Sequence, residues 1–321
     1  MQDARRILIA VLATTALAAG ATVASADRGA GHGGKGGAER LFTLQPDPAV
    51  GNAEGIAFDK RSRSFFVGIT ADGTIYRGTL GSDTLTPFIP GAAGKAAIGL
   101  KVRRGKLYVA GGPTGAITVY DLATRQPVAT FQTGTGGFLN DLVVTGRGDV
   151  FVTDSFRPTL WHVTAEQVRA GSGTPQGLDV SAIPYETGQF NVNGIVAKGG
   201  RKLVVVDSNS GKLFRIELGD DRASVDEIEG ATVPGGDGML LDRGRLVVVQ
   251  GAPTNQLSFL KLRGGARRAT LERTQTSDKL RGPSTVDVAK RLYLVVNADF
   301  DTSQTPFTVA GLPRRSKHGH H

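Results

Sequence analysis

The sequence contains no cysteine, only two methionines and one tryptophan, and just 6% aromatic residues. Without cysteine there can be no disulfide, thiol nucleophile or thiolate metal site, so the core or a metal with other ligands must stabilise the fold. No stretch after residue 26 shows a helical apolar face over three turns. Short apolar runs separated by Gly, Asp, Asn and Pro recur instead, and this pattern indicates an all-β fold.

Histidine is scarce as well. Among the five histidines, only His162 lies away from the two termini, in "LWHVT", where we expect a structural or exposed side chain. Ser155 and Ser208 each follow an apolar run, but neither has a histidine partner. A Ser-His-Asp triad is therefore excluded.

The formal net charge is +9, and basic residues gather in "KVRRGK", in "GGARRA" and in the C-terminal tail. Aromatic residues do not alternate with these basic ones, so we expect no nucleic-acid binding. A solvated basic surface with some affinity for anionic polymers is the simpler interpretation.

The N-terminus has the features of a secretory signal peptide. Arg5 and Arg6 precede an apolar run from Ile7, and Ala24-Ser25-Ala26 forms a small-residue cleavage signal. A membrane anchor is the alternative, but Thr, Gly and Ser dilute the run. We expect residues 1–26 to be removed and the mature chain to be extracytoplasmic, without stable membrane association.

Residues 27–38 form a Gly-rich segment and residues 314–321 a basic, His-containing tail; both compositions predict disorder. We expect one folded domain between them, over residues 39–313, and a monomer.

A repeat runs through this domain. Six segments share a small or polar start, a short apolar strand, a turn and a second, strongly apolar strand: "AEGIAFDKRSRSFFVGIT", "AIGLKVRRGKLYVAGG", "LNDLVVTGRGDVFVTDS", "VNGIVAKGGRKLVVVDS", "GDGMLLDRGRLVVVQG" and "GPSTVDVAKRLYLVV". A third strand, such as "GAITVYDL" or "GKLFRIEL", follows each one. The starts are separated by 44, 42, 53, 44 and 46 residues, the period of a four-stranded propeller blade. The sequence thus predicts a six-bladed β-propeller.

The last unit has only three strands, and "ERLFTLQPD" (39–47) precedes the first unit. We expect this N-terminal strand to complete the last blade as its outer strand, so that no sheet edge stays open where the ring closes.

The starting positions of the six units should converge on the central axis. They are Glu54, Ile98, Asn140, Asn193, Asp237 and Pro283. Ile98 and Pro283 cannot ligate a metal through their side chains. The other four offer two carboxylates and two amide carbonyls, an all-oxygen set suited to Ca²⁺, with other divalent cations as alternatives. Turn formation is the simpler explanation for Asn and Asp, but it does not explain Glu54 in the same register.

The motifs "AEGIAF", "LNDLVV", "VNGIVA" and "GDGMLL", with "VVVDS" after the third, resemble those of the senescence marker protein (regucalcin)/gluconolactonase family. Diisopropylfluorophosphatase and the paraoxonases are more distant relatives. The resemblance implies a propeller hydrolase with one catalytic Ca²⁺ in its tunnel. Glu54, Asn193 and Asp237 match the family's usual ligands, while Asn140 matches an Asn that either ligates the metal or contacts substrate. The implied substrate is a small-molecule lactone or related ester or phosphoester, with Asp237 as base or nucleophile.

Other residues are candidates for substrate contact or for support of the ligands: Asp141, Asp154, Asp207 and Phe138. Asp154 and Asp207 each follow an axial Asn by 14 residues, at the end of the second strand. Phe138 stands where the sugar-lactonase branch commonly has an Arg, which makes gluconolactone itself doubtful as a substrate. A paraoxonase-like pair of histidines is missing.

Two phenylalanines, Phe156 and Phe190, could make the mouth more apolar together with Phe138, although Phe in propellers more often packs between blades. A non-enzymatic secreted propeller, which binds a protein or glycan and holds Ca²⁺ as a structural plug, remains the alternative. A strictosidine-synthase-like propeller ranks lower, because that group lacks this metal set.

Overall fold

The computed structural model describes residues 38–219 and 222–314. The predicted signal peptide, nearly all of the Gly-rich segment and the tail from residue 315 lie outside the described residues. Arg314, which we assigned to the disordered tail, is described and pairs with Asp242, the Nε–Oδ2 distance being 2.8 Å.

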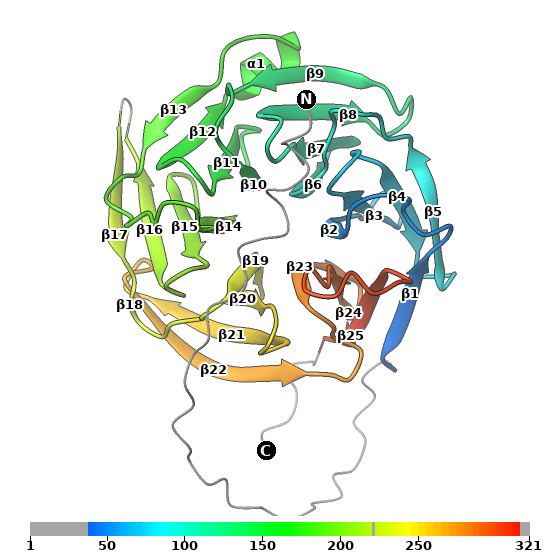
Figure 1. Ribbon diagram of the computed structural model, residues 1–321. Coiled ribbons are helices and arrows are strands. Elements are labelled where there is room, and N and C mark those ends of the chain that lie inside the picture. The colour runs from blue at the N-terminus through cyan, green and yellow to red at the C-terminus, as the bar shows by residue number, and fades with distance from the viewer. Residues whose placement is uncertain (1–37, 220–221, 315–321) are drawn as a thin grey trace, which may run out of the picture.

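The chain is all-β, with sheets arranged radially around a centre (Figure 1). Three sheets have four strands in sequence order. They consist of β6 (Leu100–Arg103), β7 (Lys106–Ala110), β8 (Ala116–Asp121) and β9 (Pro127–Gln132); β10 (Leu139–Val144), β11 (Val150–Asp154), β12 (Thr159–Val163) and β13 (Gln176–Asp179); and β14 (Val192–Ala197), β15 (Lys202–Asp207), β16 (Leu213–Leu218) and β17 (Ala223–Glu227).

The next sheet has five strands, because the two-residue β18 (Glu229–Gly230) pairs in parallel with the outermost strand. Its remaining strands, from outside to inside, are β22 (Arg268–Thr276), β21 (Gln256–Arg263), β20 (Arg245–Gln250) and β19 (Gly236–Asp242).

The last sheet has eight strands and joins the two ends of the chain. In spatial order they are β2 (Ala53–Asp59), β3 (Ser64–Ile69), β4 (Ile75–Thr79), β5 (Thr84–Ile89), β1 (Arg40–Leu44), β25 (Thr308–Pro313), β24 (Leu292–Asn297) and β23 (Pro283–Ala289). The N-terminal β1 pairs antiparallel with β25, as the incomplete last unit led us to expect. It also pairs in parallel with β5, so the first and last units form one continuous sheet. The hydrogen-bonded sheets therefore number five in the described chain, and the count of six blades stays a prediction.

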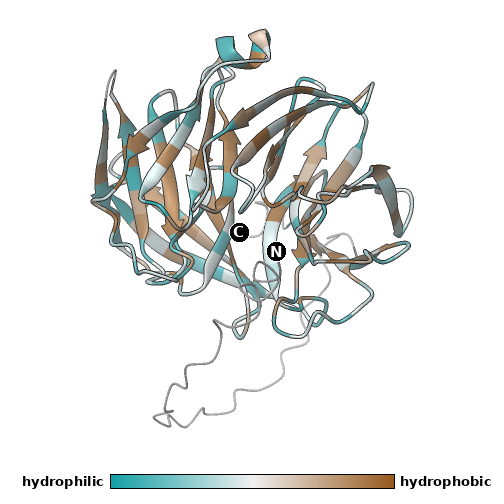
Figure 2. Ribbon diagram, turned by 45° about the horizontal axis from the view of Figure 1, so that its top comes forward, coloured by the Kyte–Doolittle hydropathy of each residue, from teal (hydrophilic) through white to brown (hydrophobic). Residues whose placement is uncertain are grey.

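Six strands line the centre and contact one another in cyclic order: β2, β6, β10, β14, β19 and β23, which returns to β2. The buried hydrophobic residues form six clusters, and each cluster combines residues of two consecutive units. Figure 2 shows the hydrophobic stretches running along the strands, with hydrophilic residues common in the connecting loops. Face-to-face packing of apolar sheet surfaces thus stabilises the ring.

One short helix, α1 (Ala165–Ala170), interrupts the connection between β12 and β13. Its N-cap Thr164 forms a capping box with Gln167, which satisfies the first backbone N–H groups of the helix. In the described part of the chain, no helix is long and apolar enough to span a membrane.

Candidate metal centre

The predicted ligands all occupy the same place in their strands. Each is the second residue of an inner strand: Glu54 in β2, Asn140 in β10, Asn193 in β14 and Asp237 in β19. In all four strands the register shifts at this point, as in a β-bulge. The residues thus lie within the strands rather than in the loops before them, and the bulge lets their side chains leave the regular alternation.

The same register corrects the sixth position. The bulge of β23 follows Pro283, so the equivalent residue is Ser284 rather than Pro283. The Ser284 hydroxyl donates to the main-chain carbonyl of Glu54 at 2.9 Å, and the Thr285 hydroxyl donates to the same oxygen at 2.5 Å. In the sixth unit, the side chains at this place therefore bind the backbone of the first inner strand, β2.

Close backbone approach brings the inner strands together. Gly55 follows Glu54, and a Cβ at this glycine would lie 1.9 Å from the Ile98 carbonyl oxygen; at Gly194 a Cβ would lie 2.2 Å from that of Asp237. Only glycine permits such contact. The glycines of "AEGIAF" and "VNGIVA" thus allow neighbouring inner strands to approach each other beside Glu54 and Asn193.

The four predicted ligands are enclosed. Glu54, Asn140 and Asn193 are 4%, 4% and 6% exposed, and Asp237 is partly buried. Among the described residues, three of their buried oxygens have no hydrogen-bond partner: Glu54 Oε2, Asn193 Oδ1 and Asp237 Oδ1. Buried polar atoms without partners are costly, so three of them in one place point to a missing partner that accepts lone pairs.

Electrostatics show that these groups share one environment. Burial, followed by the Asp237 and Asp141 carboxylates, raises the pKa of Glu54 well above its usual range, against the opposing charge of Lys101. Burial and the Asp141 carboxylate likewise raise the pKa of Asp237 to about 8, although hydrogen bonds from the Asn193 side chain and the Gly238 N–H oppose this. The site is thus short of positive charge.

Asn140 is oriented by a neighbour that we had considered only as a nucleophile. Its Nδ2 donates to Ser155 Oγ at 3.0 Å, and that hydroxyl donates to the Val192 carbonyl at 2.8 Å. The Thr153 hydroxyl donates to the Asn193 carbonyl at 2.7 Å. Thr153, in β11, and Ser155, directly after it, therefore link β10 and β14, the two strands that bear the amide ligands.

Asp141 lies beside the predicted ligands and is 2% exposed. Lys101 Nζ approaches its Oδ1 to 2.9 Å, and the Leu142 N–H donates to the same oxygen at 2.8 Å. Asp141 is thus placed near Glu54 and Asp237, but its charge is already compensated. We had assigned Lys101 to a solvated basic cluster; this was wrong, because Lys101 pairs with the buried carboxylate of Asp141.

Asp154 is fully buried and fully engaged. Its Oδ1 accepts the N–H groups of Phe138, Phe156 and Arg157 at 2.9, 3.2 and 3.1 Å; its Oδ2 accepts Arg157 Nε at 2.7 Å and Trp161 Nε1 at 3.2 Å. Asp207 Oδ2 accepts the backbone N–H and the hydroxyl of Ser210, while its Oδ1 has no partner in the described chain. Asp154 and Asp207 both organise the loop that follows their strand.

Phe138 is 8% exposed and packs against two other rings. Its centroid lies 5.5 Å from that of Phe156 and 5.0 Å from that of Phe190. Phe156 and Phe190 are 41% and 42% exposed, so these two rings do not follow the more common pattern of Phe packed between blades.

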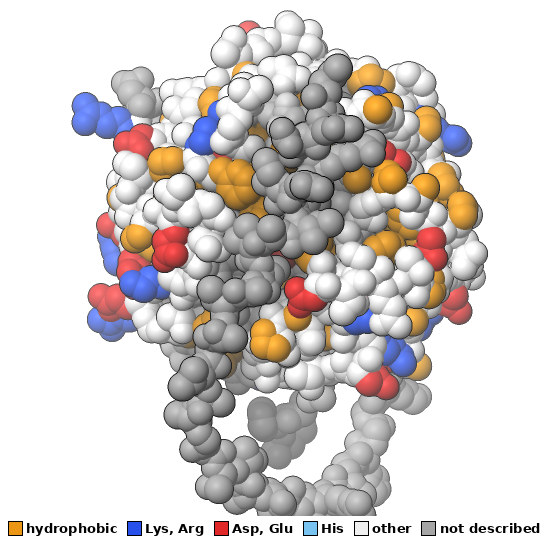
Figure 3. Space-filling model, viewed as in Figure 1, with side chains coloured by type: hydrophobic (Ala, Val, Ile, Leu, Met, Phe, Trp, Pro, Cys, Tyr) orange, Lys and Arg blue, Asp and Glu red, His pale blue; other side chains and the backbone are white. Residues whose placement is uncertain are grey.

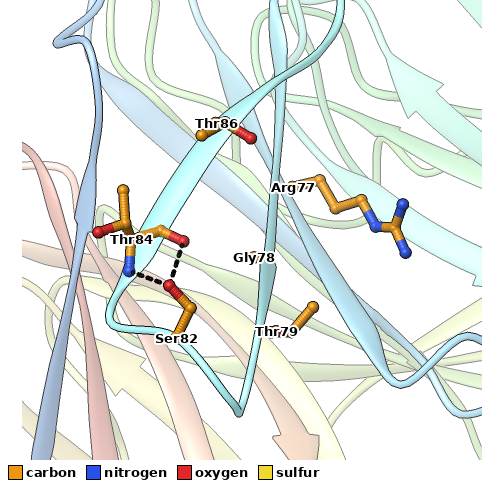
Figure 4. A pocket seen from close by; sticks show the side chains of 6 residues that line it. All are labelled: Arg77, Gly78, Thr79, Ser82, Thr84 and Thr86. Atoms are coloured by element: carbon orange, nitrogen blue, oxygen red, sulfur yellow. Dashed lines mark hydrogen bonds between the residues drawn. The ribbon is translucent and has the colours of Figure 1, made fainter.

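In the described residues, no group of three or more His, Cys, Asp or Glu side chains is arranged to hold a metal ion. The predicted set contains only two carboxylates, those of Glu54 and Asp237, and its other members are amides. A hollow of about 330 Å³ lies elsewhere, on the outer strands β4 and β5, lined by Arg77, Gly78, Thr79, Ser82, Thr84 and Thr86 (Figure 4). It contains none of the predicted site residues.

Comparison with known proteins supports the architecture. No protein-family model and no curated protein matches the chain. Among solved structures, a gluconolactonase of Xanthomonas campestris is similar with a TM-score of 0.62 and 18% identity, covering 86% of this chain and 90% of its own.

Two other structures are similar. A luciferin-regenerating enzyme has a TM-score of 0.60 and 14% identity, and the match covers 85% of this chain and 95% of the enzyme. Hydrazine synthase of Kuenenia stuttgartiensis has a TM-score of 0.56 and 13% identity, and the match covers 80% of this chain and 82% of the synthase chain. At these identities the similarity concerns the fold, which is that of a β-propeller.

Proposed function

We propose that this chain is a six-bladed β-propeller that binds one divalent cation, Ca²⁺ first among the candidates, at its axis and hydrolyses a lactone or related ester. Six inner strands in a closed ring, with six clusters between consecutive units, support the blade count. The observation that carries the metal proposal is the set of three buried oxygens without partners on Glu54, Asn193 and Asp237. Hard oxygen donors of this kind suit Ca²⁺.

The residues have distinct roles in this proposal. Glu54 and Asp237 would supply negative charge to the cation, Asn193 would supply an amide oxygen, and Asn140 would bind the cation or the substrate. When bound, the cation would polarise the carbonyl or phosphoryl oxygen of the substrate. Asp237 is the proposed base or nucleophile, because its Oδ1 is buried without a partner while Asn193 and Gly238 hold the carboxylate in place.

The class of substrate follows from the fold and the site together. The structural neighbours include a gluconolactonase, and lactone opening needs the polarised carbonyl and general base that this site could provide. With Phe138 beside the site, we do not propose gluconolactone itself. We also propose that the mature protein acts outside the cytoplasm as a monomer.

A non-enzymatic role is the second candidate. Asp154 is saturated by internal hydrogen bonds, and the Ser284 hydroxyl is bonded to the backbone of Glu54. Fewer free polar groups are therefore available to orient a polar substrate than the sequence suggested. In that case the cation would be a structural plug under a binding surface.

The deciding experiment is calorimetric titration of Ca²⁺ into chelator-stripped protein, comparing wild type with Glu54→Gln and Asp237→Asn. We expect one site in the wild type and a loss of affinity of at least about a hundredfold in each variant. Each substitution replaces an anionic ligand by a neutral amide of similar shape. Asp278→Asn is the control, because Asp278 is 88% exposed and remote in sequence. Absence of binding, or equal binding in all four proteins, would contradict the proposal.

Turnover separates the two candidates. We expect Ca²⁺-dependent hydrolysis of at least one neutral lactone, abolished by chelator and by Asp237→Asn, in a pH-indicator assay. Tight Ca²⁺ binding without hydrolysis across lactones, aryl esters and phosphotriesters would favour the plug.

A further inference from the structure

Three phenylalanines form one aromatic surface beside the candidate metal centre. Phe138, Phe156 and Phe190 are in mutual contact, with centroid separations of 5.5, 5.0 and 5.0 Å. Phe138 is buried at the base, whereas the other two rings are each about two-fifths exposed. Figure 3 shows hydrophobic side chains at the surface over the region of β11 and β14, on one side of the centre.

The chain places these rings next to the predicted ligands. Phe138 precedes β10 and lies two residues before Asn140; Phe190 precedes β14 and lies three residues before Asn193. Phe156 follows the end of β11, whose Asp154 pairs with Leu139 at the start of β10. All three rings therefore belong to the end of the strands where the amide ligands lie.

Ser155 and Asn191 connect the three loops to the ligands. The Ser155 N–H donates to the Phe138 carbonyl at 2.9 Å, its carbonyl accepts the Asn191 side chain at 3.0 Å, and its hydroxyl accepts Asn140 Nδ2. The aromatic surface and the Asn140 amide are thus held by one hydrogen-bonded frame, so their relative position is fixed.

The apolar surface continues to the axis. A Cβ at Gly112 would lie 2.8 Å from Ile98 Cγ1 and 3.5 Å from Phe138 Cε2, so these two side chains are neighbours. Ile98 is the axial residue of β6's unit. Arg157, which follows Phe156 in the same loop, is paired with Asp154 at 2.7 Å. The surface therefore offers mainly apolar contact, which favours a neutral, hydrophobic ligand over a sugar or an anion.

We propose that Phe138, Phe156 and Phe190 form a hydrophobic subsite that binds the alkyl or aromatic substituent of a neutral lactone or ester whose carbonyl lies at the axial centre. This inference rests on the proposed hydrolase function and specifies its substrate class. The two exposed rings would lose their contact with water only when such a substituent covers them.

The test uses a series of γ-lactones with alkyl substituents of increasing length, below their aggregation concentrations. Binding is followed in chelator by the fluorescence of Trp161, the only tryptophan, which is hydrogen-bonded through Asp154 to the backbone of Phe138 and Phe156. We expect the Kd to tighten about two- to fourfold per added methylene, as expected for burial of apolar surface.

The variants are Phe156→Ser with Phe190→Ser, and Phe300→Ser as control. Phe300 is also exposed, at 48%, in the loop after β24, but does not belong to the aromatic cluster. The double variant should lose the dependence on chain length and weaken binding of the longest lactone about tenfold or more, while the control keeps both. Thermal unfolding of each variant verifies that it is folded; exposed side chains of this kind affect stability little.

Equal binding of short and long lactones, or an unchanged chain-length dependence in the double variant, would overturn the subsite. Turnover with Ca²⁺ then distinguishes the two proposals. Long lactones that bind through the phenylalanines but are never hydrolysed would refute the hydrolase and support the subsite. Lactones hydrolysed at the same kcat/KM whatever their length would support the hydrolase and refute the subsite.

Discussion

Two buried carboxylates at the same end of the propeller have opposite environments. Asp154 is completely buried and accepts five hydrogen bonds. Two of them come from Arg157, one from its guanidinium group and one from its backbone N–H. Asp237 has a buried oxygen without any partner in the described chain, and the Asp141 carboxylate acts on it to raise its pKa further. Burial alone therefore does not identify a functional acid. Its hydrogen bonds and the charges around it must be considered together: Asp154 is saturated and paired with Arg157, whereas Asp237 has an oxygen without a partner and lies near the Asp141 carboxylate.

The largest effect is expected at the saturated carboxylate. Asp154→Ala removes the acceptor of three backbone N–H groups and leaves Arg157 without its ion-pair partner. We expect the free energy of unfolding to fall by about 3 kcal/mol or more, a value typical of breaking a buried charged network. Denaturant unfolding monitored by circular dichroism measures the change. A loss below about 1 kcal/mol would mean that the network contributes little and would remove the contrast with Asp237.

The second effect concerns protons at the unsaturated carboxylate. In the metal-free protein the pKa of Asp237 is raised to about 8, so Asp237 binds a proton below that pH, and burial raises the pKa of Glu54 as well, which favours its protonated form. A cation must displace these protons. We expect the Kd for Ca²⁺ to weaken as the pH falls below 8, by at least about tenfold between pH 8 and pH 6.

Calorimetry at both pH values, in buffers of different ionisation enthalpy, counts the protons released on binding. Release from Asp237 should be larger at pH 6.5 than at pH 9, where this carboxylate is ionised. An affinity that does not change across this range would show that the cation does not bind through Asp237.

The folded ring could be anticipated from spacing because each repeat supplies the same strand pattern, and every unit must bury its apolar faces against the next. The pairing of β1 with β25 followed from the incomplete last unit. Its second pairing with β5, which joins the first and last units into one sheet, leaves no trace in either strand's own sequence.

Candidate ligands could be found because Glu54, Asn140, Asn193 and Asp237 recur in one register, but the sequence could not reveal the bulge that places them inside their strands. It also misplaced the sixth position by one residue, since Pro283 and Ser284 both fit a turn. Lys101 was missed because its partner Asp141 lies on the neighbouring inner strand, so no local charge pattern links them.

A smaller effect should appear in the stability of the metal-free protein. Because the pKa of Asp237 is higher in the folded than in the unfolded state, the folded state binds more protons between about pH 4 and pH 8. The contribution of this group to stability is therefore unfavourable above pH 8 and disappears toward pH 4. Asp237→Asn removes it.

In chelator at pH 8.5, we expect Asp237→Asn to raise the Tm by at least about 2 °C relative to wild type, and by less at pH 5. Differential scanning calorimetry at the two pH values makes the comparison, with the exposed Asp278→Asn as control. A variant that is less stable than wild type at pH 8.5 would mean that the charged carboxylate is already compensated in the folded protein.

The smallest effect should come from Ser155, which links the hydrogen-bonded network of Asp154 to the candidate metal centre. Ser155 lies directly after Asp154, and its hydroxyl both accepts the Asn140 amide and donates to the Val192 carbonyl. Ser155→Ala leaves the five hydrogen bonds of Asp154 in place but frees the Asn140 amide to rotate. We expect a loss of about 1 kcal/mol in the free energy of unfolding and a severalfold weaker Kd for Ca²⁺ if Asn140 contacts the cation. The matched variant Ser208→Ala removes a hydroxyl from the equivalent position after β15, where it bonds to the Gly236 carbonyl rather than to an amide ligand. The two variants differ in that only Ser155→Ala removes a hydrogen bond to the Asn140 amide. A Kd for Ca²⁺ that weakens in Ser155→Ala alone would therefore assign Asn140 to the metal. Equal and unchanged affinities in both variants would instead assign Asn140 to the substrate.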